Sequence, residues 1–491
     1  MRPIYVFFDE KRRKFSLFYV KICIFGKNVV PLQSRLKKRC ISRSRAEVAR
    51  QAHNLKVGGS IPSSATSMKK NIILVWLTCA LSVSAVERVS LNELQSNWSR
   101  YTNHTVTLTT PLVVCGSFYD SLVLAPHRLF CPEERAVGLA DGDSSSYRQI
   151  IEENRAASIV LHCKNRYYDV RTGDILRGLR ARVTGERHLL TGQSVRTCHK
   201  PQGCLKRAKR DELRIVGTNI ENYFADLGGY ATQRTTVKQQ TLKTRKVAKA
   251  LRKMHADIFA VCEMQVGAKA PEMLLDALNK HGNKYDYVPM VQTNADQIGG
   301  AYIYNKERVR PYARWLSAYA DTANHYHSRI VAQGFETTKD GKRFVVSLSH
   351  FKSKRAGRGN YDTHLKRMTN ADSLLAMLPK AVKQFGDEDV LLLGDYNCYS
   401  QEGPVQKVIR AGYRDMLPLG MPEDYSYSFK GEAGYLDRCF ASPSMAEQVV
   451  RVRPWHVNAD WYYQHGAYKL KDKSHHRYAD HDPIIVDIKL Q

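Results

Sequence analysis

The chain of 491 residues contains no Cys-x-x-Cys pair, no internal repeat and no long tract of low complexity. The missing cysteine spacing argues against a zinc site built on that motif. The apolar stretch 71–83 is shorter than the roughly 20 residues that a membrane helix needs, and no later stretch is more apolar. We therefore expect no stable membrane insertion and no such zinc centre.

Acidic residues are also scarce, with 47 Asp and Glu against 76 Lys and Arg, which gives a formal net charge of +29. A basic excess suits a polyanionic partner such as nucleic acid or a phosphorylated headgroup, and plain solubility charge is the alternative explanation. A hydrophobic share of 43% is enough for a sizeable core, and the length suggests two or three domains.

The first 85 residues have the character of targeting and upstream sequence. Met68-Lys69-Lys70, the apolar residues 71–83 and a small residue at Ala85 predict a secretory signal peptide over 68–85, with a membrane anchor as the alternative. Residues 52–66 resemble the translation of a bacterial tRNA gene, so we interpret 1–67 as a mistranslated upstream extension. The remainder keeps 59 basic and 44 acidic residues, a net charge of +15. We expect an exported protein, periplasmic or extracellular.

Eight of the 11 cysteines follow residue 85, and five of these precede residue 206. In an exported protein that placement predicts one or two disulfide bridges, whose pairing the sequence does not determine. The other three, Cys262, Cys398 and Cys439, are interpreted as small buried thiols rather than nucleophiles or zinc ligands.

Two regions with different patterns follow the predicted signal peptide. Residues 86–198 contain short β-rich runs separated by turns, which predicts a small β-barrel or sandwich. Residues 199–212 form a basic connector that we interpret as a solvated linker. From 213 to 491, strand-like and helix-like segments alternate, which predicts an α+β domain with sheets inside and helices outside. The expected helices are 238–255, with lysines on its outer face, then 271–280, 364–378 and 404–411.

Polar residues follow the buried runs of this second region. Residues 258–262 lead to Glu263, residues 344–348 lead to His350, and residues 390–393 lead to Asp395 and Asn397. Ala479-Asp480-His481-Asp482-Pro483 leads into the final strand. Strand ends that collect carboxylates, amides and imidazoles are typical sites of metal-assisted chemistry.

Hydrolysis of a phosphodiester needs a hard cation, a base for the attacking water and donors for the developing charge. Isolated carboxylates on separate strands suit Mg²⁺, with Ca²⁺ or Mn²⁺ as alternatives, better than a cage of histidine and cysteine. Glu263 is the first choice for a metal ligand, with Asn219 and Asp480 beside it. The alternative is that Glu263 is a plain surface carboxylate at a strand end.

Six motifs occur in order along the second region. They are Thr218-Asn219-Ile220-Glu221-Asn222-Tyr223-Phe224, Cys262-Glu263, Ser349-His350-Phe351-Lys352-Ser353-Lys354, Gly394-Asp395-Tyr396-Asn397, Gly434-Tyr435-Leu436-Asp437-Arg438 and Ala479-Asp480-His481-Asp482-Pro483. Together they resemble the motifs of the endonuclease/exonuclease/phosphatase superfamily, and within it those of the secreted bacterial nucleases related to deoxyribonuclease I. The resemblance covers residues 214–489 and implies a four-layered α/β sandwich of two packed mixed sheets flanked by helices. Residues 86–198 weakly resemble the OB-like domains that precede some of these nucleases, either as nucleic-acid binders or as structural modules.

The resemblance implies a role for each matching residue. His481 would be the general base, held by Asp437, while Asp395 and Asn397 orient the attacking water and the phosphate. His350 would donate to a phosphate oxygen or protonate the leaving group, unless it is only a satisfied strand histidine. The sequence departs from the usual pattern because Ala479 replaces a serine and no Gln-Glu pair ends the acidic strand.

Basic and aromatic residues near these motifs are candidates for substrate binding. Arg329, Lys352 and Lys354 are expected to contact phosphates, and a solvated charge run is the alternative. Tyr427 and Phe429 are among the aromatics that would stack on bases or serve as packing. The sequence as a whole predicts an exported, magnesium-dependent endonuclease for DNA and possibly RNA, acting as a monomer. The alternatives are a phosphatase or sphingomyelinase-like phosphodiesterase, and an inactive nucleic-acid-binding protein.

Overall fold

The structure, a computed structural model, separates the chain into residues 1–84 and 85–491. In the first unit only the backbone of two strands is described, β1 (Val6–Asp9) and β2 (Lys14–Leu17), which pair antiparallel. The predicted signal peptide and most of the predicted upstream extension lie outside the described residues. The description of the second unit covers residues 86–118, 120–163, 170–192, 195, 197–198, 205–227, 236–292, 297–321, 326–355, 363–417, 424–461 and 474–491, with backbone alone at 320–321 and 326–327.

Residues 86–198 form an eight-stranded sheet, here named the N-terminal sheet. Pro111, which has no N–H to donate to a sheet ladder, lies between the strands 105–108 and 112–118. The OB-like closure of this region stays a prediction. In spatial order the strands are β3 (Glu87–Val89), β4 (Thr105–Leu108), β10 (Arg180–Gly185), β11 (His188–Thr191), β8 (Ile159–Cys163), β6 (Ser121–Ala125), β5 (Leu112–Phe118) and β9 (Ile175–Leu176).

The N-terminal region also contains helices. The longest, α5 (Ser145–Ala157), has no fully buried side chain. The others are α2 (Leu91–Ser96), α3 (Trp98–Tyr101) and α4 (Pro132–Arg135).

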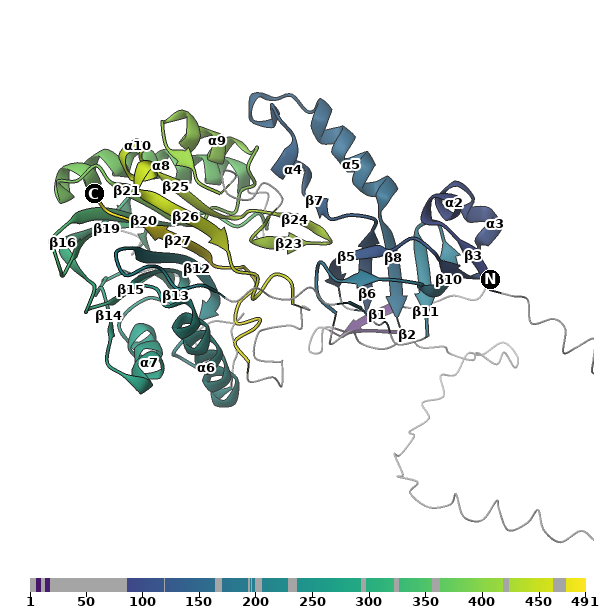
Figure 1. Ribbon diagram of the computed structural model, residues 1–491, viewed down its shortest axis with the longest axis horizontal. Coiled ribbons are helices and arrows are strands. Elements are labelled where there is room, and N and C mark those ends of the chain that lie inside the picture. The colour runs from purple at the N-terminus through teal and green to yellow at the C-terminus, as the bar shows by residue number, and fades with distance from the viewer. Residues whose placement is uncertain are drawn as a thin grey trace, which may run out of the picture. The chain divides into compact units, whose positions relative to one another are not determined.

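Residues 213–491 form a mixed α/β region with two six-stranded sheets, in agreement with the predicted class (Figure 1). The first, named the β12 sheet, has the order β14 (Tyr285–Tyr287), β15 (Ile298–Asn305), β13 (Ile258–Gln265), β12 (Leu213–Tyr223), β27 (Ile484–Ile488) and β26 (Val449–Pro454). The second, named the β21 sheet, has the order β16 (Val309–Ser317), β19 (Ile330–Thr337), β20 (Arg343–His350), β21 (Val390–Asp395), β25 (Asp437–Ala441) and β22 (Arg414–Asp415).

The two sheets pack face to face, and helices cover their outer faces. Leu393 and Val486 belong to the apolar core between the sheets. Gly217 of β12 allows a close approach, since a Cβ there would lie 3.2 Å from the Leu393 Cβ. Helices α6 (Val237–Met254) and α7 (Lys269–Leu278) cover the β12 sheet, while α8 (Thr363–Phe385) and α9 (Gly403–Arg410) cover the β21 sheet, with α10 (Pro443–Gln448) beside β25. The polar strand ends of both sheets therefore meet at one edge.

A small three-stranded sheet joins the two regions. Its strands are β23 (Tyr427–Phe429), β24 (Glu432–Gly434) and β7 (Leu129–Phe130), and β7 comes from the N-terminal region. Glu134 adds polar contacts, because its carboxylate accepts hydrogen bonds from the backbone of Ser400 and Tyr435. We name this element the joining sheet.

Cys115, Cys131 and Cys198 are free thiols. The predicted disulfides are therefore wrong for these three cysteines, and Cys204 lies outside the described residues. The buried Cys115, Cys131 and Cys163 belong to three different apolar clusters. Cys262, Cys398 and Cys439 are buried thiols, as the sequence predicts.

Candidate active site

Glu263 is placed by a bulge at the end of β13. Its backbone is left-handed, with φ of +63°, and the pairing of β13 with β15 shifts register between Cys262 and Met264. A non-glycine residue in this conformation costs about 1–2 kcal/mol, and such strain concentrates at functional sites. The bulge turns the carboxylate out of the strand alternation and towards the edge where both sheets end.

Asn219 connects two carboxylates at this edge. Its Nδ2 donates to Glu263 Oε1 at 2.9 Å and to Asp395 Oδ2 at 3.2 Å. Its Oδ1 accepts from the backbone N–H of Glu221 at 2.8 Å, while Glu263 Oε2 accepts from the backbone N–H of Asn222 at 2.8 Å. In this amide orientation Asn219 holds the carboxylates together rather than pointing an oxygen between them.

Asp395 reaches the same point from the β21 sheet. Gly394 before it has φ of +133°, and a Cβ at that position would lie 1.9 Å from the Ser349 carbonyl oxygen, so only glycine fits. The parallel register of β20 and β21 sets His350 beside Asp395. Asn397, with φ of +49°, donates its backbone N–H to Asp395 Oδ1 at 2.8 Å and its side-chain amide to the Phe351 carbonyl at 3.2 Å.

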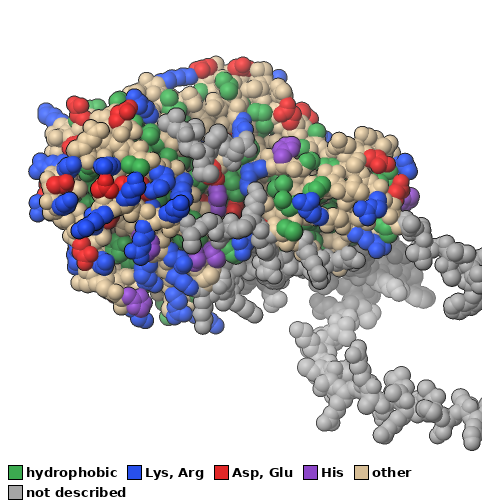
Figure 2. Space-filling view, in the orientation of Figure 1, with side chains coloured by type: hydrophobic (Ala, Val, Ile, Leu, Met, Phe, Trp, Pro, Cys, Tyr) green, Lys and Arg blue, Asp and Glu red, His purple; other side chains and the backbone are tan. Residues whose placement is uncertain are grey.

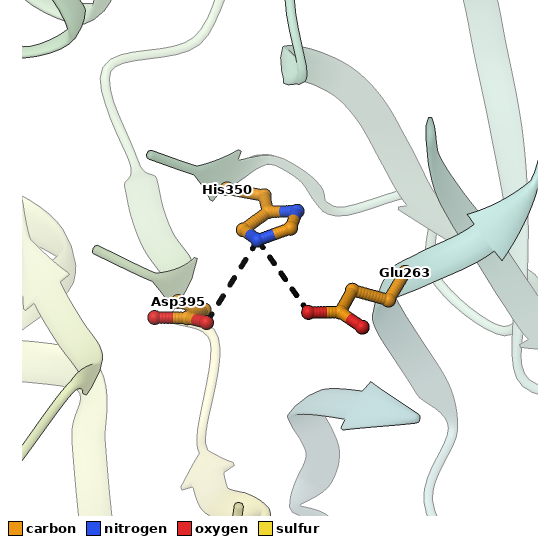
Figure 3. Close-up of side chains that lie close together, drawn as sticks. All are labelled: Glu263, His350 and Asp395. Carbon is orange, nitrogen blue, oxygen red and sulfur yellow. Dashed lines mark ion pairs between the residues drawn. The ribbon is translucent and has the colours of Figure 1, made fainter. Parts of the chain in front are cut away.

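Glu263, His350 and Asp395 form a cluster that could hold a metal ion (Figure 3). His350 Nε2 lies 3.7 Å from Glu263 Oε1 and 3.9 Å from Asp395 Oδ2. Burial raises the pKa of Glu263, and the neighbouring charge of Asp480 raises it further. Burial also raises the pKa of Asp395 to about 7. Two carboxylates that resist ionisation side by side fit a site that a cation completes.

His350 is a neutral imidazole in this setting. Burial, together with the positive charge of Arg329, lowers its pKa well below the ordinary value. Its Nδ1 is buried and makes no hydrogen bond within the described residues. The ring therefore presents Nε2 to the two carboxylates and leaves a second nitrogen for a further partner.

His481 lies on the other side of Asp395. Its Nδ1 is 2.9 Å from Asp437 Oδ2 and 3.9 Å from Asp395 Oδ2, and its Nε2 is 3.9 Å from Asp480 Oδ2. Burial acts to lower its pKa, but the charges of Asp437, Asp395 and Asp480 raise that pKa well above the ordinary value. The side-chain amide of Asn458 donates to the His481 carbonyl at 2.6 Å and fixes the backbone.

Lys243 and Glu221 form a buried ion pair at the same edge of the sheets, and the sequence did not lead us to expect it. Lys243 Nζ lies 3.6 Å from Glu221 Oε2 and donates to the carbonyl of Tyr478. The prediction that the lysines of this helix face outward is wrong for Lys243 and Lys246, which are both buried. A signal existed for Lys243, because it stands four residues before Val247 on the apolar stripe of α6.

The three predicted phosphate contacts lie in different surroundings. Arg329 is close to the cluster, since its carbonyl accepts the His350 backbone N–H at 3.0 Å and its charge acts on Glu263. Lys352 donates to the Ser353 hydroxyl at 3.0 Å. Lys354 contacts Glu402 and lies 3.8 Å from Glu133, with its Nζ 4.5 Å from the centre of the Tyr399 ring. Lys354 thus lies at the contact with the N-terminal region rather than in the cluster.

Residues 232–481 match the model of the Endonuclease/Exonuclease/phosphatase family. The chain belongs to this family. Family members are hydrolases that act on phosphoester bonds and use divalent metal ions. No curated protein matches the chain.

Solved structures of the family are similar to part of the chain. A family protein from Bacteroides thetaiotaomicron has 15% identity and a TM-score of 0.41, covering 58% of this chain and 100% of its own. The catalytic domain of human Nocturnin, with a bound sulfate, has 16% identity and a TM-score of 0.39, covering 58% and 97%. An AP endonuclease from Archaeoglobus fulgidus has 15% identity and a TM-score of 0.38, covering 57% and 100%.

Proposed function

We propose that this protein is an exported, metal-dependent phosphodiesterase that cleaves nucleic acid as an endonuclease with low sequence specificity. The observation that carries the proposal is the position of Asp395, whose Oδ2 lies 3.9 Å from the imidazole of His350 and 3.9 Å from that of His481. Asp395 thus belongs to the candidate cation cluster and also lies beside His481, whose own hydrogen-bonded partner is Asp437.

Glu263 and Asp395 are the residues that would hold the ion, and oxygen ligands are what Mg²⁺ prefers. Mg²⁺, or Ca²⁺ or Mn²⁺ in its place, would offset negative charge on the phosphoryl oxygens. Asn219 keeps the two carboxylates together. Asp480, predicted as a ligand, contributes negative charge near Glu263 and His481.

His481 is the base for the attacking water in this proposal. Asp437 holds Nδ1, so Nε2 is the nitrogen that takes the proton while the water oxygen bonds to phosphorus and the ester bond to the departing sugar oxygen breaks. The carboxylate charge that raises the His481 pKa is the charge that a bound cation offsets. His350 serves as a neutral N–H donor to a phosphate oxygen, and Asn397 and Arg329 orient the phosphate.

The substrate class is supported by charge. On the face drawn in Figure 2, Lys and Arg side chains crowd the surface over the two six-stranded sheets. Polyanions bind such surfaces by releasing counterions. A phosphorylated headgroup or a sugar phosphate is the competing substrate, because the family includes phosphatases as well as nucleases.

A plasmid nicking assay with the purified full chain tests this function. We expect nicking in Mg²⁺ that is lost with a chelator and in His481→Ala, while His104→Ala, which removes an exposed histidine, keeps full activity. Nicking that survives both the chelator and the His481 change would contradict the mechanism. Release of phosphate from headgroups with an intact plasmid would instead favour the phosphatase alternative.

Export and the OB-like identity of residues 86–198 belong to the same proposal. Residues 68–85 support export by their charged, apolar and small segments in order. Fractionation of cells that express residues 68–491, which begin at the predicted signal peptide, checks export, with recovery of the protein in the cytoplasm as the contrary result. Within the described residues no helix is long and apolar enough to cross a membrane.

A further inference from the structure

A cavity of about 470 Å³ lies where the N-terminal region meets the candidate active site. Its lining includes Phe118 at the end of β5, Phe429 of β23, and Asp480 and Tyr427 from the site itself. The ring of Tyr427 lies 4.6 Å from that of His481, centre to centre. The cavity is therefore continuous with the place where the ester bond would be cut.

Aromatic side chains give the cavity its chemical character. Phe118 is 48% exposed and Phe429 is 52% exposed, which is unusual for phenylalanine. The rings of Tyr427 and Phe429 are nearly parallel, at 12°, with centres 6.5 Å apart. Exposed aromatic faces beside a phosphodiesterase site suit unpaired bases, which stack on such rings whatever their sequence.

Positive charge accompanies the aromatic rings. Arg355, Lys430 and Arg477 line the cavity, and Asp480 is its acidic residue among those described. Lys430 Nζ lies 5.3 Å from the centre of the Phe429 ring, so a base on that ring would have its phosphate within reach of a cation. This combination of cations and aromatic faces matches a strand of nucleic acid and not an apolar ligand.

The two walls of the cavity are held at a fixed separation. Gly116 of β5 packs on Gly431 in the turn between β23 and β24, since a Cβ at 116 would lie 2.8 Å from the Gly431 Cα. Next to this contact, β24 pairs with β7 of the N-terminal region. The N-terminal region thus supplies one wall and also pairs with β24, the neighbour of the strand β23 that carries Tyr427 and Phe429.

We propose that this cavity binds the unpaired nucleotides that adjoin the scissile bond, which makes single-stranded nucleic acid the preferred substrate. The inference rests on the proposed nuclease function. A continuous duplex keeps its bases stacked inside the helix, so they cannot lie on Phe118 and Phe429. The volume falls within the range of about 300–1,000 Å³ that is usual for bound small molecules, which suits a short unpaired stretch.

Steady-state kinetics of the full chain on three substrates test the proposal. The substrates are a labelled single-stranded oligonucleotide, a hairpin duplex of the same sequence, and a small chromogenic phosphodiester that occupies only the catalytic edge. In the double variant Phe118→Ala with Phe429→Ala, we expect KM for the single strand to rise by about tenfold or more. Hydrolysis of the small diester should be unchanged, which also shows that the variant is folded. Val450→Ala, an exposed apolar residue of β26 outside the cavity lining, should change none of the three.

An unchanged KM for the single strand, or equal losses on single strand and duplex, would overturn the inference while leaving the nuclease function in place. Fluorescence anisotropy of the same oligonucleotide, measured with a chelator present, tests binding independently of cleavage. Wild type that cleaves nothing but binds the single strand, with binding weakened in the double variant, would reject the catalytic proposal and keep the binding site. Lys430→Gln should weaken binding and reduce its salt dependence by about one counterion.

Discussion

His350 and His481 flank the same carboxylate, are both buried, and have pKa values shifted in opposite directions. Burial pulls both values down. For His350, the positive charges of Arg329, His481 and Lys352 lower the pKa further, whereas for His481 the charges of three carboxylates outweigh the effect of burial. The comparison shows that neighbouring charge, and not depth, decides which imidazole can carry a proton at this edge.

The largest effect should come from removing the shared carboxylate. We expect Asp395→Asn to lower kcat by about a thousandfold or more, because it removes both a candidate ion ligand and the charge between the histidines. Initial rates on nucleic acid and on the small diester measure it. Asp276→Asn, on the exposed face of α7, is the control and should be silent. Activity within tenfold of wild type would show that Asp395 is structural.

Asp437→Asn tests the comparison at His481, because it removes one of the carboxylates that raise the pKa of this histidine. The neutral amide can offer Nδ1 either a donor or an acceptor and no longer stabilises a protonated ring, so we expect kcat to fall by about a hundredfold or more with KM little changed. A rise in KM alone would mean that Asp437 acts in substrate binding.

Two substitutions of His350 test the other histidine of the comparison. His350→Gln retains an N–H donor and His350→Ala does not, so we expect Gln to keep about tenfold more activity than Ala. Thermal unfolding of both variants serves as the folding control. Equal losses in the two variants would contradict a donor role.

The smallest effect concerns His456, a third histidine among carboxylates and outside the proposed chemistry. Its ring nitrogens lie 2.6 Å from Asp424 and 2.9 Å from Asp482. Burial lowers its pKa, but the charge of Asp460 and the hydrogen bonds to Asp424 and Asp482 raise that pKa well above the ordinary value. Because the folded pKa is the higher one, the stabilisation is complete below the unfolded pKa of about 6.5 and is lost as pH rises through the folded pKa. Urea unfolding should show His456→Gln destabilised by about 1.5 kcal/mol or more at pH 6 and by less at pH 9. An equal loss at both values would exclude a charged pair.

The mixed α/β class and the order of the polar strand ends were predictable, because both follow from local patterns. Buried runs of four or five mostly apolar residues mark β13, β20 and β21, and Glu263, His350 and Asp395 stand one or two residues after those runs. Parallel register then brings the ends of neighbouring strands together without further information.

Features that depend on contacts between distant segments were not predictable. The pairing of β7 with β24 involves two short strands about 300 residues apart, and neither has a periodicity of its own. The left-handed backbone of Glu263 leaves no mark in the sequence, because glutamate has no preference for it. The charge of Lys243 concealed its burial, although its spacing agreed with the apolar stripe.

The joining sheet has a consequence for the boundaries of any shortened enzyme. A fragment that begins after residue 205 would lack β7, so β24 would have unpaired backbone donors and acceptors along one side. An unpaired strand edge of this kind promotes association between molecules. The same cut would also remove the strand that pairs with β24, and β24 in turn pairs with β23, which carries the Tyr427 ring that contacts His481. Residues 86–198 therefore contribute to the structure around the candidate active site and should be kept in a shortened protein.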